Sequence, residues 1–157
     1  MDAHANLVGE IFPEFSLKDS HGNTFNQDRL KGTWTVLFFY PKDGSPGCTI
    51  ESCSFRDRQT EIETLGAQII GISADSMSRH QRFKAKHRLQ YTLLSDPQSR
   101  LSKKLRLKRT LGFMRGRVTF VIDPSGVIQG TVTSQFNPKK HVRSAIFQLK
   151  ELTKTAE

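Results

Sequence analysis

The stretch WTVLFFY, residues 34–40, places the strongest constraint on how this chain can fold. It is a continuous apolar run, whereas a strand with one face in water would alternate apolar and polar side chains. The stretch AQIIGIS, residues 67–73, has the same character. Runs of this kind are typical of strands that are buried on both faces, so we expect a central sheet with helices packed against it.

Further strands and helices are predicted around this pair. RVTFVID (117–123) and VIQGTVT (127–133), joined by the turn PSG, predict an antiparallel hairpin. Residues 12–32 predict a short N-terminal hairpin with DSHGN as its turn. Three helical patterns are visible: from Pro46 to about Leu65, from Ser76 to Arg88, and from Ser99 to Lys104. Strands that alternate with helices in this way predict an α/β fold with a mixed central sheet.

The last helix has the clearest pattern. Asn137 suits the N-cap and Pro138 suits the first helical position. The apolar residues that follow recur at steps of three and four, which predicts one stripe that packs on the sheet. They are Val142, Ala145, Ile146, Leu149 and Leu152.

Length and composition indicate a globular protein. The chain has 157 residues, enough for one ordinary domain with its own core, so we predict a single domain over residues 1–157. No apolar run reaches the roughly 18 residues that span a bilayer, and no secretory signal is visible, so we expect no membrane partner. Two cysteines do not make a disulfide-stapled secreted domain, and their closeness favours a reversible catalytic pair.

The net charge is +9, and much of the excess lies in one stretch. Between Pro97 and Ile122 there is no acidic residue. The basic residues of this stretch are Arg100, Lys103, Lys104, Arg106, Lys108, Arg109, Arg115 and Arg117. Such a patch can attract an acidic protein, an anionic substrate or nucleic acid, but it is also typical of a solvated basic face. Because no nucleic-acid-binding motif accompanies it, we expect a solvated face and no nucleic-acid partner.

The segment SPGC places the first cysteine at the start of a helix. Ser45 can act as the N-cap, Pro46 as the first helical residue, and Gly47 permits close backbone approach. Cys48 then lies in the first turn, where unpaired backbone N–H groups and the positive end of the helix dipole converge. We expect this position to lower the pKa of the thiol and to favour the nucleophilic thiolate, more so if an arginine lies nearby.

The second cysteine, Cys53, follows Cys48 at a C-x4-C spacing. Five residues of α-helix correspond to about 7.5 Å of rise and roughly 140° of rotation, which is too far for a disulfide. Either no bond forms, or its formation unwinds the first helical turns. A pair of inert core cysteines is an open alternative at this point. A metal site is not expected, because His80, His87 and His141 lack ligand spacing, and the C-x-x-C of a thioredoxin-type reductase is absent.

The segment FYPKDGSPGCTIESCSFRD closely resembles the active site of the peroxiredoxins, specifically the bacterioferritin-comigratory or peroxiredoxin Q subfamily. IIGISADS, YTLLSDP and RVTFVIDPSG extend the resemblance over nearly the whole chain. The family signature P-x-x-x-[TS]-x-x-C falls on Pro41, Ser45 and Cys48, with Ser45 where many members carry Thr. The family's active-site arginine matches Arg117. The resolving cysteine, where it lies on the same helix, matches Cys53.

This resemblance implies a thioredoxin-like fold and a thiol peroxidase acting on hydrogen peroxide and organic hydroperoxides. The Cys48 thiolate would attack one peroxide oxygen and become a sulfenic acid. Arg117, the Ser45 hydroxyl and backbone N–H groups near Gly47 would hold the peroxide oxygens and stabilise the leaving one. Pro41 would shield the site from water.

The resemblance also implies the rest of the pocket and the close of the cycle. Tyr40 either lines the pocket or packs in the core. Cys53 would attack the Cys48 sulfenic sulfur to form an intramolecular disulfide, which thioredoxin or a thioredoxin-like donor reduces. No cofactor is implied, the chain is expected to be a monomer, and its location is a bacterial cytoplasm or a plastid. The alternative function, from another class, is a redox-sensing or chaperone-like binding module on the same fold.

Overall fold

The computed structural model describes residues 4–107 and 116–155. The strands are β1 (Ser16–Asp19), β2 (Thr24–Asn26), β3 (Trp34–Phe39), β4 (Ala67–Ser73), β5 (Thr92–Ser95), β6 (Val118–Ile122) and β7 (Ile128–Thr133). They form one seven-stranded sheet in the order β2-β1-β5-β4-β3-β6-β7. The pairs β3–β4 and β4–β5 are parallel and the other pairs are antiparallel, which confirms the predicted mixed sheet.

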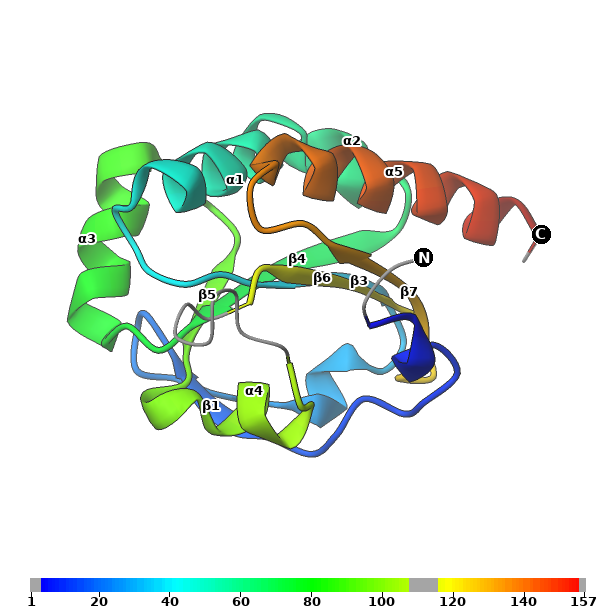
Figure 1. Cartoon of the computed structure of the whole chain (residues 1–157), viewed down its shortest axis with the longest axis horizontal. Helices are drawn as coiled ribbons and strands as arrows, with labels where there is room; N and C mark the ends of the chain where they lie inside the picture. Colours follow the sequence, from blue (N-terminus) through cyan, green and yellow to red (C-terminus); the bar gives the residue numbers. More distant parts are fainter. Residues whose placement is uncertain (1–3, 108–115, 156–157) are drawn as a thin grey trace.

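Helices lie on both sides of this sheet (Figure 1). The α-helices are α1 (Pro46–Asp57), α2 (Gln59–Thr64), α3 (Met77–His87), α4 (Arg100–Lys104) and α5 (Pro138–Thr155). Short 3-10 helices are η1 (Ala5–Leu7), η2 (Gln27–Leu30) and η3 (Pro97–Ser99). Helices α1, α2 and α5 lie together on one side, and α4 lies on the other side.

The sheet separates two hydrophobic cores. Successive side chains of a strand point to opposite faces, so Val36 and Phe38 join the core that includes α1 and α5, while Leu37 and Phe39 join the core that includes α4. All four side chains are at most 4% exposed. This confirms that the apolar run of β3 is buried on both faces.

Several predicted elements are confirmed in detail. β6 and β7 form the predicted hairpin, and β1 and β2 form the N-terminal one. Helix α5 begins at Pro138, as expected. Four residues of its predicted stripe are buried, and Leu152 is partly buried and packs against the same core. The buried four are Val142, Ala145, Ile146 and Leu149.

The predicted elements differ from the structure at two places. The helix expected from Pro46 to Leu65 is two helices, because Arg58 adopts φ −109° and ψ 10° between them. Phe55 and Ile62 are both buried in the same core on either side of this break, so the apolar spacing does not reveal it. Strand β5 was not predicted, because its four residues do not alternate and no tight turn joins it to β1 or β4, its partners in the sheet.

The basic stretch is solvated where the structure describes it, apart from its last member. Exposed side chains on or just after α4 are Arg100, Lys103, Lys104 and Arg106. Lys108, Arg109 and Arg115 lie outside the described residues, and Arg117 is buried, so it does not belong to a solvated face. Across residues 4–107 and 116–155, no helix is long and apolar enough to cross a membrane.

Candidate active site

The turn between β3 and α1 carries the first group of predicted site residues. Helix α1 begins at Pro46, so Cys48 lies in its first turn, and its side chain is fully buried. Ser45 occupies the N-cap position, but its hydroxyl makes no capping bond. The hydroxyl donates to the carbonyl of Lys42 at 3.0 Å, which corrects the predicted capping role of this side chain. Ser45 therefore leaves the first backbone N–H groups of α1 uncapped by its side chain.

Arg117 reaches Cys48 from the neighbouring strand. Because β6 runs antiparallel to β3, the residue before β6 lies beside the turn that follows β3. The Nη2 of Arg117 donates to the Sγ of Cys48 at 3.4 Å, and its Nη1 donates to Oε1 of Glu51 at 2.8 Å. Its Nε and backbone N–H donate to the two oxygens of Gln135. The guanidinium is therefore held in one orientation, with one edge at the sulfur.

Gly47 makes this contact possible. A Cβ atom built at this position would lie 3.1 Å from Nη2 of Arg117, closer than about nine in ten such contacts in proteins. The sequence predicts that something approaches the backbone closely at Gly47, and in the structure this is the side chain of Arg117. Any larger residue would press the guanidinium away from Cys48.

Glu51, one turn after Cys48 on α1, is a site residue that the sequence analysis missed. It is fully buried. Burial raises the pKa of its carboxyl to about 8, although Arg117 opposes the shift. Burial lowers the pKa of Arg117, but Glu51 and Cys48 outweigh this effect and the net shift is upward. At neutral pH Glu51 is thus largely uncharged, and the positive charge of Arg117 remains available to a thiolate at Cys48.

His141 of α5 stands on the far side of Glu51. Its Nδ1 lies 3.6 Å from Oε2 of Glu51 and 2.8 Å from the hydroxyl of Thr119. Its Nε2 lies 2.7 Å from the carbonyl of Ser134, which only accepts, so this nitrogen donates. His141 and Thr119 are far from α1 in the sequence, and only the fold brings them to Glu51. For Glu51 itself there was one local signal: it follows Cys48 by three residues, which places both side chains on the same face of a helix.

Buried polar contacts hold the turn that precedes α1. The Tyr40 hydroxyl donates to Oδ1 of Asp43 at 2.6 Å, and Nδ1 of His80 lies 2.6 Å from Oδ2 of Asp43. The backbone N–H of Asp43 donates to Asp75 at 2.8 Å. Burial, and then the Asp43 carboxylate, raises the pKa of Tyr40 well above its usual value. Of the two alternatives for Tyr40, its 2% exposure favours core packing; Pro41 beside it is half-buried.

Cys53 lies on the same uninterrupted helix as Cys48. Both thiols are free, and Cys53 is half-buried. With about 7.5 Å of rise between the two positions, the sulfurs cannot bond while the helix is intact. The Tyr91 hydroxyl donates to the carbonyl of Ser52 at 2.8 Å and so fixes the helix next to Cys53.

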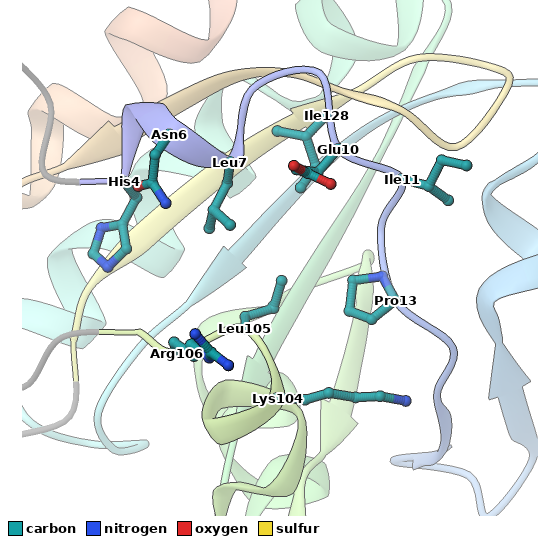
Figure 2. A pocket seen from close by; sticks show the side chains of 10 residues that line it. All are labelled: His4, Asn6, Leu7, Glu10, Ile11, Pro13, Lys104, Leu105, Arg106 and Ile128. Atoms are coloured by element: carbon teal, nitrogen blue, oxygen red, sulfur yellow. The ribbon is translucent and has the colours of Figure 1, made fainter.

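Figure 2 shows a pocket that lies away from these residues. It has a volume of about 490 Å³ and is lined partly by Leu105 and Ile128, which belong to the core on the α4 side. Cys48 belongs to the other core. Within the residues that the structure describes, no group of three or more His, Cys, Asp or Glu side chains is placed to hold a metal ion.

This arrangement favours sulfur chemistry, since a thiolate beside a guanidinium is a nucleophile and a second thiol can capture its oxidised form. The fold and site define a thiol-dependent oxidoreductase.

Residues 8–131 match the AhpC/TSA family. Chloroplastic peroxiredoxin Q of Populus jackii is 40% identical over 145 residues, which cover 92% of this chain and 68% of that protein. The Triticum aestivum protein of the same name is 42% identical over 135 residues, which cover 85% of this chain and 62% of that protein. The chain belongs to the AhpC/TSA family and is a peroxiredoxin.

Solved structures agree with this assignment. Peroxidoxin BcpB from Mycobacterium tuberculosis superposes with a TM-score of 0.84 at 34% identity, covering 92% of this chain and 97% of that one. Peroxiredoxin Q from Xanthomonas campestris superposes with a TM-score of 0.82 at 29% identity, covering 88% and 91%. These similarities confirm the thioredoxin-like fold and the resemblance to the peroxiredoxin Q subfamily.

Proposed function

We propose that Cys48 is the peroxidatic residue and that it reduces hydrogen peroxide and organic hydroperoxides. The observation that carries this proposal is the contact of Arg117 Nη2 with the Cys48 sulfur at 3.4 Å, where a largely uncharged Glu51 leaves the guanidinium charge available. The thiolate attacks one oxygen, the O–O bond breaks, and the sulfur becomes a sulfenic acid. The other oxygen leaves as hydroxide or alkoxide and takes a proton to become water or an alcohol.

Hydrogen-bond donors around Cys48 support the binding of the peroxide. Nη2 of Arg117 already lies at the sulfur, and the backbone N–H groups of Gly47 and Cys48 lie at the positive end of α1. The Ser45 hydroxyl joins them when it turns from the carbonyl that it now contacts. Donors held at the oxygen that gains charge lower the barrier to O–O cleavage. Pro41, half-buried at the start of the turn, shields the sulfur from water.

We further propose that Cys53 resolves the sulfenic acid. The Cys53 thiolate attacks the Cys48 sulfur, an S–S bond forms and water is released. This step is supported by the position of both thiols on α1, and it requires the turns between them to unwind. Thioredoxin or a thioredoxin-like protein then reduces the disulfide. Because both thiols belong to one chain, turnover needs no second subunit, and we propose that residues 1–157 act as one domain and as a monomer. The chloroplastic relatives support the plastid alternative for its location.

The test is mass spectrometry of the reduced protein after one equivalent of hydrogen peroxide. We expect Cys48 and Cys53 to become linked within one chain. The Cys53→Ser variant should instead accumulate a Cys48 sulfenic acid that dimedone traps, and Cys48→Ser should do neither. Retained peroxide turnover in Cys48→Ser would refute the peroxidatic assignment. Retained thioredoxin-dependent turnover in Cys53→Ser would refute only the resolving one. Oxidation without any thiol-supported turnover would favour the redox-sensing alternative.

A further inference from the structure

A hollow lined by positive charges lies beside the turn that leads into α1. It has a volume of about 310 Å³, with Arg79, Arg82, Phe83 and Lys86 of α3 on one side and Asp43 and Gly44 on the other. The three basic side chains are exposed, whereas Phe83 between them is buried. Gly44 directly precedes Ser45, so the hollow borders the start of the segment that must unwind to join the two thiols.

The same positive surface continues to the far end of that segment. Nη1 of Arg56, on α1, donates to the carbonyl of His87 at the end of α3 with a distance of 2.8 Å. The pKa of His87 is lowered by burial and then by the charges of Lys86 and Arg56, so both cations lie near one ring. We call the set Arg56, Arg79, Arg82 and Lys86 the cationic rim.

The carboxylates near the cationic rim neutralise only part of its charge. Asp43, which lines the hollow, is buried and its two carboxylate oxygens contact Tyr40 and His80. Asp75 pairs with Arg79 and Asp57 pairs with Arg56. Among the described residues no carboxylate pairs with Arg82 or Lys86. The sequence has no acidic residue from 76 to 95. The surface therefore keeps a net positive charge along α3.

We propose that the cationic rim is the docking surface for an acidic dithiol protein that reduces the Cys48–Cys53 disulfide. This inference rests on the proposed function. Hydrogen peroxide is uncharged, so a cationic surface does nothing for its capture, whereas oppositely charged surfaces speed the encounter of two proteins. The hollow can receive a projecting carboxylate of such a partner beside its cations, the start of the unwinding segment borders it, and Arg56 beyond the other end contacts the end of α3.

The reduction that this docking serves is a two-electron exchange. One thiolate of the partner attacks the Cys48–Cys53 disulfide, which forms a mixed disulfide and releases one thiol of this chain. The second thiol of the partner then displaces the other sulfur. The partner leaves as a disulfide, and this chain recovers two thiols and its folded α1. Ile50, 44% exposed on α1, is an apolar side chain of the same segment that a partner can contact.

The test compares a charge-reversed rim with a matched control. Arg82→Glu/Lys86→Glu reverses two charges on α3, and Arg100→Glu/Lys103→Glu reverses two exposed charges on α4, across the sheet. Each protein is oxidised with peroxide and reduced by an acidic thioredoxin or by dithiothreitol. At low ionic strength, kcat/KM for thioredoxin should fall about tenfold or more in the rim variant only. Reduction by dithiothreitol and the rate of oxidation by peroxide should stay unchanged. Salt should reduce the rate of the unmodified chain towards that of the variant.

Three results would overturn the proposal. The first is a rim variant with the same kcat/KM for thioredoxin as the unmodified chain. The second is an α4 control that loses as much of this kcat/KM as the rim variant does. The third is a rim variant whose reduction by dithiothreitol slows as much as its reduction by thioredoxin. Double-stranded DNA and phosphatidylserine vesicles are tested with the same variants. If either binds through the rim while thioredoxin kinetics stay unchanged, the surface serves that polyanion instead. Failure of the proposed function has a different signature, because the unmodified chain would then consume no peroxide even with dithiothreitol, and both proposals would fall.

Discussion

Replacing Glu51 with glutamine tests the electrostatics of the site. Burial raises the pKa of this carboxyl from 4.5 to about 8 in the folded protein. Between these two values the folded state holds one proton more than the unfolded chain, so the free energy of unfolding falls as the pH rises. The slope is about 1.4 kcal/mol per pH unit, which amounts to ~3 kcal/mol between pH 4.5 and 7. Glutamine keeps an oxygen that accepts from Arg117 but does not titrate.

The stability difference between Glu51→Gln and the unmodified protein should therefore grow by about 3 kcal/mol in favour of the variant between pH 4.5 and 7, and level off above pH 8. Urea denaturation of the reduced proteins, followed by circular dichroism at several pH values, measures it. Glu151→Gln, at an exposed position of α5, should give a curve parallel to that of the unmodified protein. If the Glu51→Gln curve is also parallel, Glu51 is charged in the folded site and the reasoning fails.

Three further substitutions test other contacts. Gly47→Ala places a Cβ 3.1 Å from Nη2 of Arg117. It should slow peroxide reduction in stopped-flow assays by about tenfold to a hundredfold, and an unchanged rate would exclude this donor. Tyr91→Phe removes the hydrogen bond beside Cys53, so it should cost about 1 kcal/mol of stability and speed disulfide formation in a single turnover. Phe55→Ala removes a fully buried ring that stacks on a β3 ring 4.4 Å away. It should lower the free energy of unfolding in urea by about 3–5 kcal/mol, and a much smaller loss would contradict the packing described.

The elements that were predictable are those whose pattern is contained in their own residues. β3 and β4 are long enough for an unbroken apolar run, and α5 combines Pro138 with a regular apolar stripe. β5 is four residues long and owes its strand conformation to pairing with β4 and β1, which no local pattern expresses. The break at Arg58 affects one residue between two segments that pack on the same core, so the spacing of apolar residues continues through it.

The site divides in the same way. The segment around Cys48 predicted a cysteine in the first turn of a helix, because each residue type there suits its position. Arg117 was recognised through the family motif, since a strand-end arginine alone indicates nothing about its partner. Glu51 and His141 were missed because their roles depend on burial and on pairing between α1 and α5, which only the tertiary structure supplies. The Ser45 hydroxyl was assigned to a cap, but the carbonyl of Lys42 lies within its reach.

In the proposed cycle, the position of both thiols on α1 makes a folding step part of every turnover. The opening rate of the first turns of this helix is then a ceiling on kcat. It also determines how long the sulfenic acid of Cys48 faces a second peroxide molecule, which would carry the sulfur on to the sulfinic acid. A tighter α1 would thus give an enzyme that is slower and more easily inactivated by excess peroxide. Glu51 lies within those turns, so its contact with Arg117 breaks each time they open.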